Sequence, residues 1–352
     1  MAGFERVGLG RVETMLRTSV EAREVPGLVA ACGVRDDVAW QMAAGEAESA
    51  PYRVRPMTAD TIFDLASLTK VVATLPVVLS LVEEGRLTVS DRVLTYLPEF
   101  AGEGKDEVTI GHLLGHSAGL IAGREFYRTT SGPALFEAAA MEPLAAAPGE
   151  RTVYSDIGFL MLGEIAARVS GRSLAVAARE RVFEPLGMAS TGFLPDPSLK
   201  PRVAATEAKE SREGPKVAVV HDENAEALGG VAGHAGLFAP VADLCRYAAM
   251  WTGGSRSVLS PWTRARALEP HAAPPARRGW GWVLKGDTMD HTGDLWPAGT
   301  FAHTGFTGTA IAGDPASGAW AILLTNRVHF GRQVDIRRLR ARFHNALAAA
   351  IA

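Results

Sequence analysis

The sequence predicts an α+β fold whose antiparallel sheet is assembled from both ends of the chain, with mostly helical material inserted between them. Strand-like runs lie near each end, within residues 28–44 and 279–325, and the pattern between them is mostly helical. Helix-like segments stand outside these strands, at residues 4–24 and 334–351. Because such a sheet needs strands from both ends, truncation of either end is expected to be severe.

The N-terminal elements are a helix and a hairpin. Residues 4–24 mix Glu and Arg with apolar side chains, which is typical of an amphipathic helix and not of the uncharged core of a signal peptide. Residues 28–34 and 38–44 flank the turn sequence Arg35-Asp36-Asp37, and this arrangement predicts a hairpin.

The middle of the chain begins with a short strand at residues 61–64, followed by an apolar helix at 71–84. The polar stretch 200–214 predicts an exposed loop. Further helices are expected at 110–114, 133–141, 157–169, 174–182, 241–251 and 261–268.

Strand character returns in the last eighty or so residues. We therefore expect an α/β lobe from residues 1–65 and 275–352, and a helical lobe from 66–274. The late strands are expected at 279–285, 300–304, 308–313 and 320–325. The closing helix has one arginine-rich side that we expect to face solvent: Arg337, Arg338, Arg340 and Arg342.

Composition narrows the classes of partner. The net charge of −3 over 352 residues gives no basic footprint for nucleic acid. The longest apolar runs, within 71–82 and 346–352, are too short to span a bilayer, so we expect no membrane insertion and a cytoplasmic location. Cys32 and Cys245 lie far apart in the sequence and are expected to be buried free thiols.

The strongest chemical signal is Ser67-Leu68-Thr69-Lys70. On a helix this spacing places the Ser67 hydroxyl and the Lys70 amine on one face, so the amine can take the proton of the hydroxyl. Ser67 also falls where the strand at 61–64 meets the helix at 71–84. The free N–H groups and positive dipole end of a first helical turn favour a nucleophile that carries negative charge.

Lysine at its usual pKa of roughly 10.4 is a poor base at neutral pH, so a second titratable group is needed. Tyr154, in Tyr154-Ser155-Asp156, can take over proton transfer if a protonated lysine stabilises its phenolate. A third element, His303-Thr304-Gly305-Phe306, ends a predicted strand. Gly305 permits close approach to a substrate, and the backbone N–H of Phe306 is expected to join that of Ser67 as an oxyanion hole.

In this order, the three motifs resemble the serine β-lactamase and penicillin-binding-protein superfamily, in particular its class C-like branch of esterases, D-aminopeptidases and D,D-peptidases. The resemblance extends from about residue 25 to about residue 330 through "TIFDLASLTKVVAT", "LVEEGRLTVSDRVLTYLPEF", "VTIGHLLGHSAGL", "YSDIGFLMLGEI", "PLGM", "GGVAGHAGLF" and "HTGFTGT". It implies a β-lactamase-like fold with the active site in the groove between the two lobes. It also implies an acyl-enzyme on Ser67, proton exchange between Lys70 and Tyr154, and no metal or other cofactor.

Two departures from the family pattern bear on the substrate. Asp156 stands where the family usually has asparagine, and an ionised carboxylate accepts hydrogen bonds but cannot donate them. It is expected to hold Lys70 protonated and to repel an anionic acyl group. His303 stands where lysine is frequent, and a mostly neutral histidine grips a substrate carboxylate less firmly. Both departures favour neutral ester or amide substrates over penicillins.

The segment Gly115-His116-Ser117-Ala118-Gly119 also matches the nucleophile elbow of α/β-hydrolases. That elbow needs a strand before its serine and a long helix after it. A short helix is expected before Ser117, and residues 120–130 are poor helix formers. We therefore interpret this segment as structural.

Two patterns resemble cofactor sites only in part. His112 and His116 have the spacing of zinc ligands on a helix, but no glutamate follows the first histidine and no third ligand is evident. The glycines of residues 229–236 lack the preceding strand and downstream acid of a dinucleotide site, so they predict a flexible loop beside the groove.

Four polar residues lie in or beside this glycine loop: His221, Asp222, Asn224 and His234. The sequence leaves open whether its histidines are satisfied by neighbours or line the substrate site. At least two of the late tryptophans are expected in the core: Trp280, Trp282 and Trp296.

The sequence as a whole predicts a serine hydrolase that acts on a small ester or amide. Within the enzymes, a D-amino-acid peptidase or cell-wall carboxypeptidase and an acyltransferase remain as alternatives. From another class, a non-catalytic acyl-ligand-binding or scaffold protein remains, although a binding module need not retain Ser67, Lys70 and Tyr154 together. The natural substrate, its stereochemistry and the oligomeric state are left open.

Overall fold

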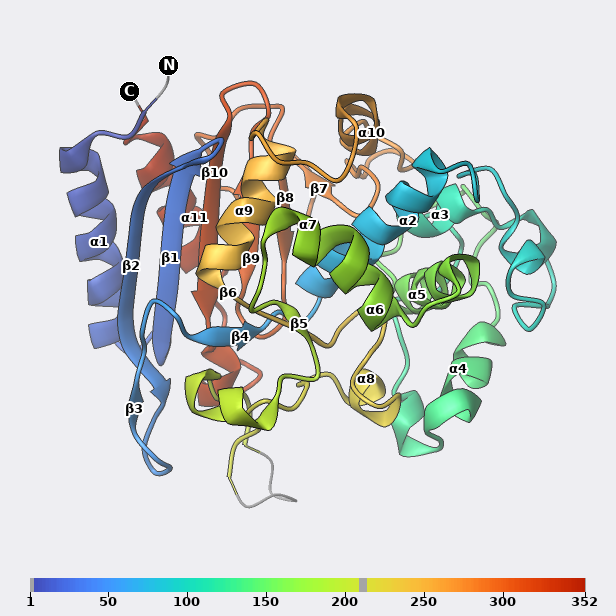
Figure 1. Ribbon diagram of the computed structural model, residues 1–352, viewed down its shortest axis with the longest axis horizontal. Helices are drawn as coiled ribbons and strands as arrows, with labels where there is room; N and C mark the ends of the chain where they lie inside the picture. Colours follow the sequence, from blue (N-terminus) through green and yellow to red (C-terminus); the bar gives the residue numbers. More distant parts are fainter. Residues whose placement is uncertain (1–2, 209–213, 352) are drawn as a thin grey trace.

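The central strands of the main sheet come from opposite ends of the chain. A computed structural model describes residues 3–208 and 214–351, and its seven-stranded sheet has the order β3-β2-β1-β10-β9-β8-β7 with antiparallel pairing throughout (Figure 1). β1 pairs with β10 from Leu28 opposite Thr325 to Val34 opposite Ala319, which confirms the predicted assembly from both ends. The strands are β1 (Gly27–Val34), β2 (Asp37–Glu48), β3 (Arg55–Pro56), β7 (Val283–Leu284), β8 (Phe301–Thr304), β9 (Ala310–Gly313) and β10 (Ala319–Thr325).

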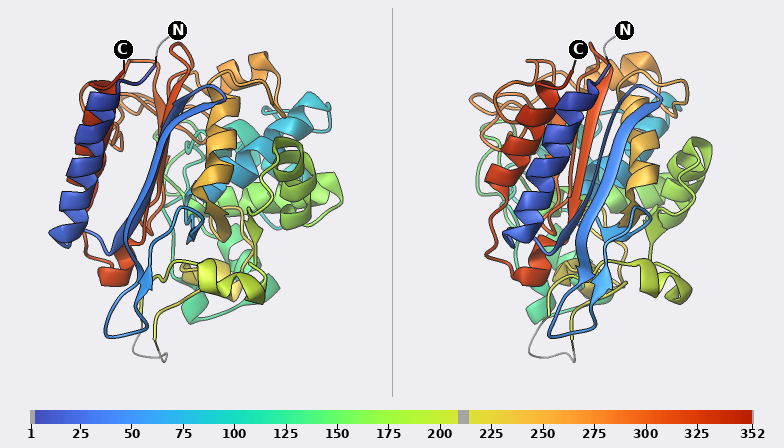
Figure 2. Two further views of the ribbon diagram at one scale, coloured as in Figure 1. Left: turned by 60° about the vertical axis from the view of Figure 1, so that its left-hand side comes forward. Right: turned by 90° about the vertical axis from the view of Figure 1, so that its left-hand side faces the viewer.

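Helices cover both faces of this sheet. α1 (Arg6–Glu21) and α11 (Arg337–Ala348) lie side by side on one face, as both views of Figure 2 show. The opposite face is covered by α9 (Val241–Trp251), which packs on β1, β9 and β10. α9 falls within the range expected for the helical lobe, yet it packs on the sheet.

Alternate residues of β1 serve these two layers, as expected for a strand buried on both sides. Leu28, Ala30 and Cys32 belong to the core beneath α1 and α11. Val29 and Ala31 belong to the larger core that continues into the helical part of the chain.

One arginine of α11 does not face solvent as expected. Arg337 and Arg338 are exposed, but Arg340 is 8% exposed, and its Nη2 donates to the carbonyl oxygens of Gly305 at 3.2 Å and Thr309 at 3.1 Å. Position 340 lies one turn after the buried Ile336, so it shares the sheet-facing side of the helix. A long basic side chain placed there reaches the carbonyls beyond the end of β8.

The strand that leads to Ser67 belongs to a second, three-stranded sheet. In this sheet β4 (Ile62–Asp64) and β5 (Gly192–Phe193) flank β6 (Leu237–Pro240). The expected strand at 61–64 is therefore confirmed. The apolar helix expected after it begins as a π-helical turn, η1 (Lys70–Thr74), and continues as α2 (Leu75–Glu83).

The expected helices between residues 110 and 268 are present. The helix that begins at Asp156 has well-defined ends. The Ser155 hydroxyl caps its first turn, and Gly171, with a left-handed φ of +70°, ends it. The α-helices are α3 (Ile110–Leu114), α4 (Gly132–Ala140), α5 (Asp156–Ser170), α6 (Leu174–Ala178), α7 (Glu184–Leu186), α8 (Glu223–Ala227) and α10 (Pro261–Ala267). A π-helical turn, η5 (Arg179–Phe183), joins α6 to α7, and 3₁₀ turns are Val93–Thr95, Lys105–Glu107, Phe126–Arg128, Pro197–Arg202 and Arg327–Phe330.

Two expected segments differ from the structure. The strand expected at 279–285 is reduced to Val283–Leu284, because Gly281 has a φ of +73° and Trp280 donates its N–H to Ala267. The loop expected to be exposed at 200–214 is buried over residues 203–206, where backbone N–H groups bond to β2 and β4. Its residues 209–213 lie outside the described part of the chain.

Other expectations about the core are confirmed. Cys32 and Cys245 are buried and free. All three late tryptophans are buried: Trp280, Trp282 and Trp296.

No helix in the described part of the chain is long and apolar enough to cross a membrane.

The contrast between two arginines of α11 gives a test of the fold. Arg340→Ala removes a buried side chain and two hydrogen bonds, so we expect it to lower the free energy of unfolding by about 2–4 kcal/mol. Arg338→Ala is the matched control, because Arg338 is exposed on the same helix and its loss is expected to cost less than about 0.5 kcal/mol. Urea unfolding of both variants measures the difference. Equal destabilisation would show that Arg340 does not anchor this region.

Candidate active site

Ser67 lies at the junction where β4 turns into the helical segment. Ala66, just before it, has a left-handed φ of +46°, and its N–H donates to Asp64 Oδ1 at 2.8 Å. The Lys70 N–H donates back to the Ser67 carbonyl at 3.1 Å. Ser67 is half-buried and stands one turn before Lys70, as the sequence predicts. The π-helical turn that begins at Lys70 is a feature frequent at functional sites.

The third motif packs against the chain that leads into Ser67. The Thr307 hydroxyl donates to the Asp64 carbonyl at 2.7 Å, and the Thr309 hydroxyl donates to the Leu65 carbonyl at 3.1 Å. Gly305 is required at this contact, because a Cβ there would lie 2.3 Å from the Leu65 oxygen. The sequence predicts that this glycine makes room for a substrate, whereas the close contact in the structure is with Leu65, two residues before Ser67.

Lys70 is completely buried and paired with Asp156. Its Nζ lies 2.6 Å from Asp156 Oδ1, 3.2 Å from the His234 carbonyl and 4.9 Å from the centre of the Tyr154 ring. Burial by itself lowers the pKa of Lys70, but the Asp156 carboxylate and Tyr154 outweigh it and raise the pKa above its ordinary value. Lys70 is therefore an ammonium ion at neutral pH.

Two histidines pack near the Tyr154 ring. The ring centroids of His116 and His303 lie 4.7 Å and 5.8 Å from that of Tyr154. Burial, followed by the positive charges of Arg278 and Lys70, holds the pKa of both histidines well below the ordinary value. Both imidazoles are therefore neutral at pH 7, which agrees with the expectation of a mostly neutral His303.

The Tyr154 segment is held by the residues that resemble a nucleophile elbow. His116 Nδ1 accepts the Ser155 N–H at 3.1 Å, and the His116 carbonyl accepts the Val153 N–H at 2.9 Å. Ser117 is 4% exposed, follows helix α3 and accepts the Gly149 N–H with its carbonyl. No strand precedes Ser117, so the segment has a structural role.

The residues that resembled cofactor sites have structural contacts. His112 Nδ1 accepts the Thr109 N–H and caps α3. Gly233 lies against α5, where a Cβ would come within 2.0 Å of the Phe159 carbonyl, so the loop passes too close for any larger residue. Within residues 3–208 and 214–351, no cluster of His, Cys, Asp or Glu side chains is arranged to hold a metal ion.

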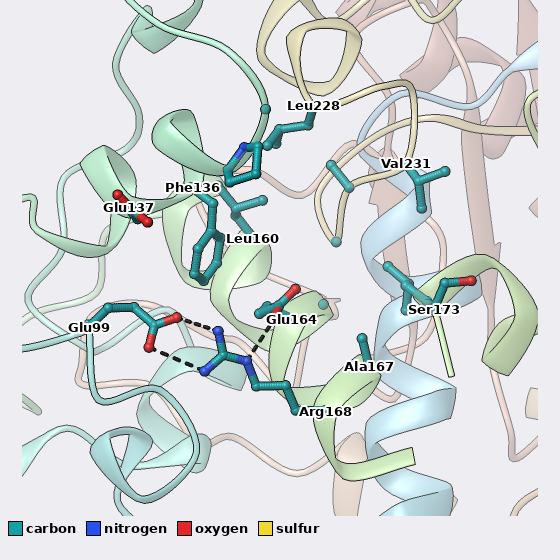
Figure 3. A pocket seen from close by; sticks show the side chains of 16 residues that line it. Glu99, Phe136, Glu137, Leu160, Glu164, Ala167, Arg168, Ser173, Leu228 and Val231 are labelled. Atoms are coloured by element: carbon teal, nitrogen blue, oxygen red, sulfur yellow. Dashed lines mark hydrogen bonds and ion pairs between the residues drawn. The ribbon is translucent and has the colours of Figure 1, made fainter. Parts of the chain in front are cut away.

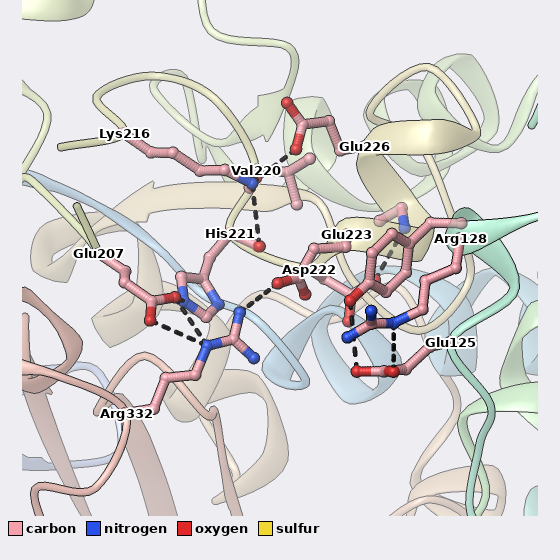
Figure 4. Close-up of polar contacts among 12 residues, drawn as sticks. Glu125, Arg128, Glu207, Lys216, Val220, His221, Asp222, Glu223, Glu226 and Arg332 are labelled. Atoms are coloured by element: carbon pink, nitrogen blue, oxygen red, sulfur yellow. Dashed lines mark hydrogen bonds and ion pairs between the residues drawn. The ribbon is translucent and has the colours of Figure 1, made fainter. Parts of the chain in front are cut away.

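Each loop histidine pairs one ring nitrogen with a carboxylate and also contacts site residues, while Nδ1 of His234 is buried without a hydrogen-bond partner among the described residues. His221 Nε2 lies 3.0 Å from Glu207 (Figure 4). The backbone N–H of His221 donates to Asp64, and its ring stacks on Phe306. His234 Nε2 lies 3.0 Å from Asp222, while its carbonyl accepts from Lys70.

The structure thus brings Lys70, Tyr154, Asp156 and His303 together, with Ser67 one turn away. Thr304 is half-buried, its carbonyl oxygen lies 2.9 Å from His303 Nδ1, and the Phe306 side chain is 46% exposed. Two further residues lie near Tyr154 that the sequence does not predict as site residues: His116 and Arg278. His116 lies in a segment that carries the family resemblance, whereas Arg278 has no motif of its own.

A separate cavity of about 500 Å³ lies between α4, α5 and the glycine loop (Figure 3). Its lining includes Phe136, Leu160 and Arg168, which is paired with Glu99 and Glu164. None of Ser67, Lys70 and Tyr154 lines it. The cavity is therefore distinct from the candidate site.

The chain is similar in sequence to curated bacterial proteins. The chain is 33% identical over 305 residues to a protein of Escherichia coli K12 named "Putative D-alanyl-D-alanine carboxypeptidase", covering 77% of this chain and 70% of that protein. A protein of Escherichia coli O157:H7 with the same name is 30% identical over 366 residues, covering 93% and 84%.

Solved structures share the fold at lower sequence identity. A class C β-lactamase has a TM-score of 0.79 and 20% identity, covering 98% of this chain and 97% of its own. The hydrolase EstCE1, described as having promiscuous acyltransferase activity, has a TM-score of 0.75 and 23% identity, covering 97% and 98%. The octameric penicillin-binding-protein homologue of Pyrococcus abyssi has a TM-score of 0.78 and 22% identity, covering 97% and 77%.

The family assignment extends over nearly all of the sequence. The profile of the family described as Beta-lactamase matches residues 12–345, a range that contains all three motifs. With its β-lactamase-like fold and these relatives, the chain belongs to the Beta-lactamase family.

Proposed function

We propose that the protein is a serine hydrolase that forms an acyl-enzyme on Ser67 and releases the acyl group to water. The observation that carries this proposal is the buried Lys70 ammonium, held by Asp156 and facing the Tyr154 ring at 4.9 Å. A cation beside a phenol favours the phenolate, and a phenolate is a strong enough base to activate a serine hydroxyl.

Proton transfer follows from this arrangement. Tyr154 takes the hydroxyl proton of Ser67 as the Oγ–carbon bond forms, and it then gives that proton to the leaving group as the ester or amide bond breaks. Lys70 remains charged throughout and stabilises the phenolate. A water molecule then attacks the acyl-enzyme, and Tyr154 again takes and returns the proton. This step releases the acid and regenerates Ser67.

Two backbone donors support the developing oxyanion. Among the described residues, neither the N–H of Ser67 nor that of Phe306 donates to a protein acceptor, so both remain available. The hydroxyls of Thr307 and Thr309 hold the third motif against the backbone that precedes Ser67. Fixed donors of this kind stabilise negative charge without rearrangement during the reaction.

The charges at the site favour an uncharged acyl group. The side chain of Asp156 is 40% exposed, so its carboxylate, although paired with Lys70, remains in part open to solvent. His303 is neutral and adds no positive charge. We therefore assign small neutral esters or amides as the preferred substrates, with weak β-lactamase activity at most, and we retain the cytoplasmic location as part of this proposal.

A D-alanyl carboxypeptidase is the second candidate. The names of the curated relatives favour it, and so does Arg327, whose guanidinium lies 4.6 Å from the centre of the exposed Phe306 ring and brings positive charge near the third motif. Acyl transfer to an alcohol other than water is the activity named for EstCE1. Adding acceptor alcohols or D-alanyl peptides to the assay distinguishes these reactions from ester hydrolysis.

Ser67→Ala is expected to lower kcat for an activated short-chain ester by roughly 10⁶-fold, because the nucleophile is lost. Incubation with a fluorophosphonate, followed by mass measurement of the intact protein, should show one adduct in the wild-type protein and none in the variant. Ser117→Ala is the matched control and should retain labelling. An adduct on Ser67→Ala, or no adduct on the wild-type protein, would contradict the assignment, and the second result would favour a non-catalytic binding protein.

The wild-type protein is expected to hydrolyse an activated short-chain ester faster than a cephalosporin, since the cephalosporin brings an anionic substrate to a site with an exposed carboxylate. Comparison of kcat/KM for the two substrates at pH 7.5 and one ionic strength tests this preference. A clear preference for the cephalosporin would mean that Asp156 and His303 do not set specificity as proposed.

Asp156→Asn tests the carboxylate directly. Asparagine keeps an oxygen acceptor for Lys70 but removes the negative charge and adds an amide donor. We expect the ratio of cephalosporin to ester kcat/KM to rise about tenfold, which corresponds to about 1.4 kcal/mol of relieved repulsion. An unchanged ratio, in a variant that still labels at Ser67, would assign the specificity to other groups.

A further inference from the structure

A second buried cation lies beside Tyr154. Arg278 precedes β7, and the carbon of its guanidinium lies 5.4 Å from the centre of the Tyr154 ring. Its side chain is only 4% exposed. With Lys70 Nζ at 4.9 Å from the same ring, the phenol has two cationic neighbours that come from distant parts of the sequence.

The charge of Arg278 is incompletely paired. The carboxylate of Asp287 is 3.5 Å from Nη2, a longer separation than the 2.6 Å between Lys70 and Asp156. Asp287 also accepts the backbone N–H groups of Arg277 and Met289, so its oxygens are shared. Nη2 of Arg278 also donates to Met289 Sδ at 2.6 Å, which is an uncharged acceptor. Nη1 of Arg278 is buried and has no hydrogen-bond partner among the described residues. Asp287 is therefore the one carboxylate paired with Arg278 among the described residues, and it neutralises the positive charge only in part.

The other titratable groups around Tyr154 do not supply this charge. His116 and His303 are neutral because they are buried near Lys70 and Arg278. The negative charge of Asp156 is bound directly by Lys70. His303 carries no charge, so among these neighbours the second positive charge near Tyr154 is that of Arg278.

We propose that Arg278 is a positioning residue that stabilises the phenolate of Tyr154 and supplies the positive charge that His303 does not. This role rests on the proposed function, in which Tyr154 takes the proton of Ser67. Arg278 acts through Tyr154 and not on the substrate. The proton moves from Ser67 Oγ to the phenolate oxygen, and the negative charge passes to the substrate oxygen as the Oγ–carbon bond forms.

The sign of the effect follows from this role. A general base acts only when it is deprotonated, so kcat/KM is expected to fall on the acidic side of the pH profile. Removal of a nearby cation makes the phenolate less stable, and the acidic limb of the kcat/KM profile then moves to higher pH. For a partly screened charge about 5 Å away, we expect a shift of about 1–2 pH units.

The test measures kcat/KM for an activated short-chain ester against pH in three variants. Arg278→Gln should move the midpoint of the acidic limb upward, and Arg278→Lys should restore most of the wild-type midpoint. Asp287→Asn removes the counter-charge of Arg278 and should move the midpoint downward. Arg264→Gln is the control, because Arg264 is a half-buried arginine of α10 that bonds the Met250 carbonyl, and it should leave the midpoint unchanged.

Each outcome decides between the alternatives. A uniform loss of activity in Arg278→Gln, without movement of the limb, would make Arg278 merely structural and overturn the proposal. Circular dichroism shows whether Arg278→Gln folds. If it does not fold, a downward shift of the midpoint in Asp287→Asn together with a preserved midpoint in Arg278→Lys supports the role. An unmoved midpoint in Asp287→Asn overturns it. Fluorophosphonate labelling of the wild-type protein separates the two proposals, because absence of an adduct rejects the serine hydrolase itself, whereas labelling with unshifted profiles rejects only Arg278.

Discussion

The ion pair between Lys70 and Asp156 is the interaction on which the candidate site depends. A fully buried ammonium is costly unless a carboxylate and further acceptors surround it, and here Asp156 and the His234 carbonyl provide them. The pair also joins the helix after β4 to the first residue of α5. One contact therefore fixes both the charge of Lys70 and the position of Tyr154, two residues before Asp156.

The third motif is held in place by elements from both ends of the chain. Thr307 and Thr309 bond the backbone next to β4, and Arg340 of α11 bonds the carbonyls of Gly305 and Thr309 from the other side. Gly305 allows this approach because no side chain intervenes. The geometry of the site is thus inseparable from the packing of the C-terminal helix against the sheet.

Local patterns predicted much of this arrangement. The strand before Ser67, the helix that begins at Asp156 and the sheet built from both ends follow from hydrophobic periodicity, capping residues and turn residues. The burial of Arg340 and the position of Arg278 could not be predicted in the same way. Their surroundings depend on contacts between segments that are distant in the sequence. Without knowledge of those contacts, an arginine on a helix or before a strand is expected to be exposed to solvent. The shortened strand at β7 has a related cause, since Gly281 bends the backbone and Trp280 bonds to Ala267 in preference to a neighbouring strand.

The pairing of β1 with β10 has a consequence for synthesis of the protein. Translation delivers β1 long before β10 leaves the ribosome, so one edge of β1 stays unpaired in the nascent chain. Closure of the sheet and attachment of the third motif wait until residues 303–325 have been synthesised. A chain that terminates before β10 therefore leaves a long apolar strand with a free edge, and we expect it to aggregate.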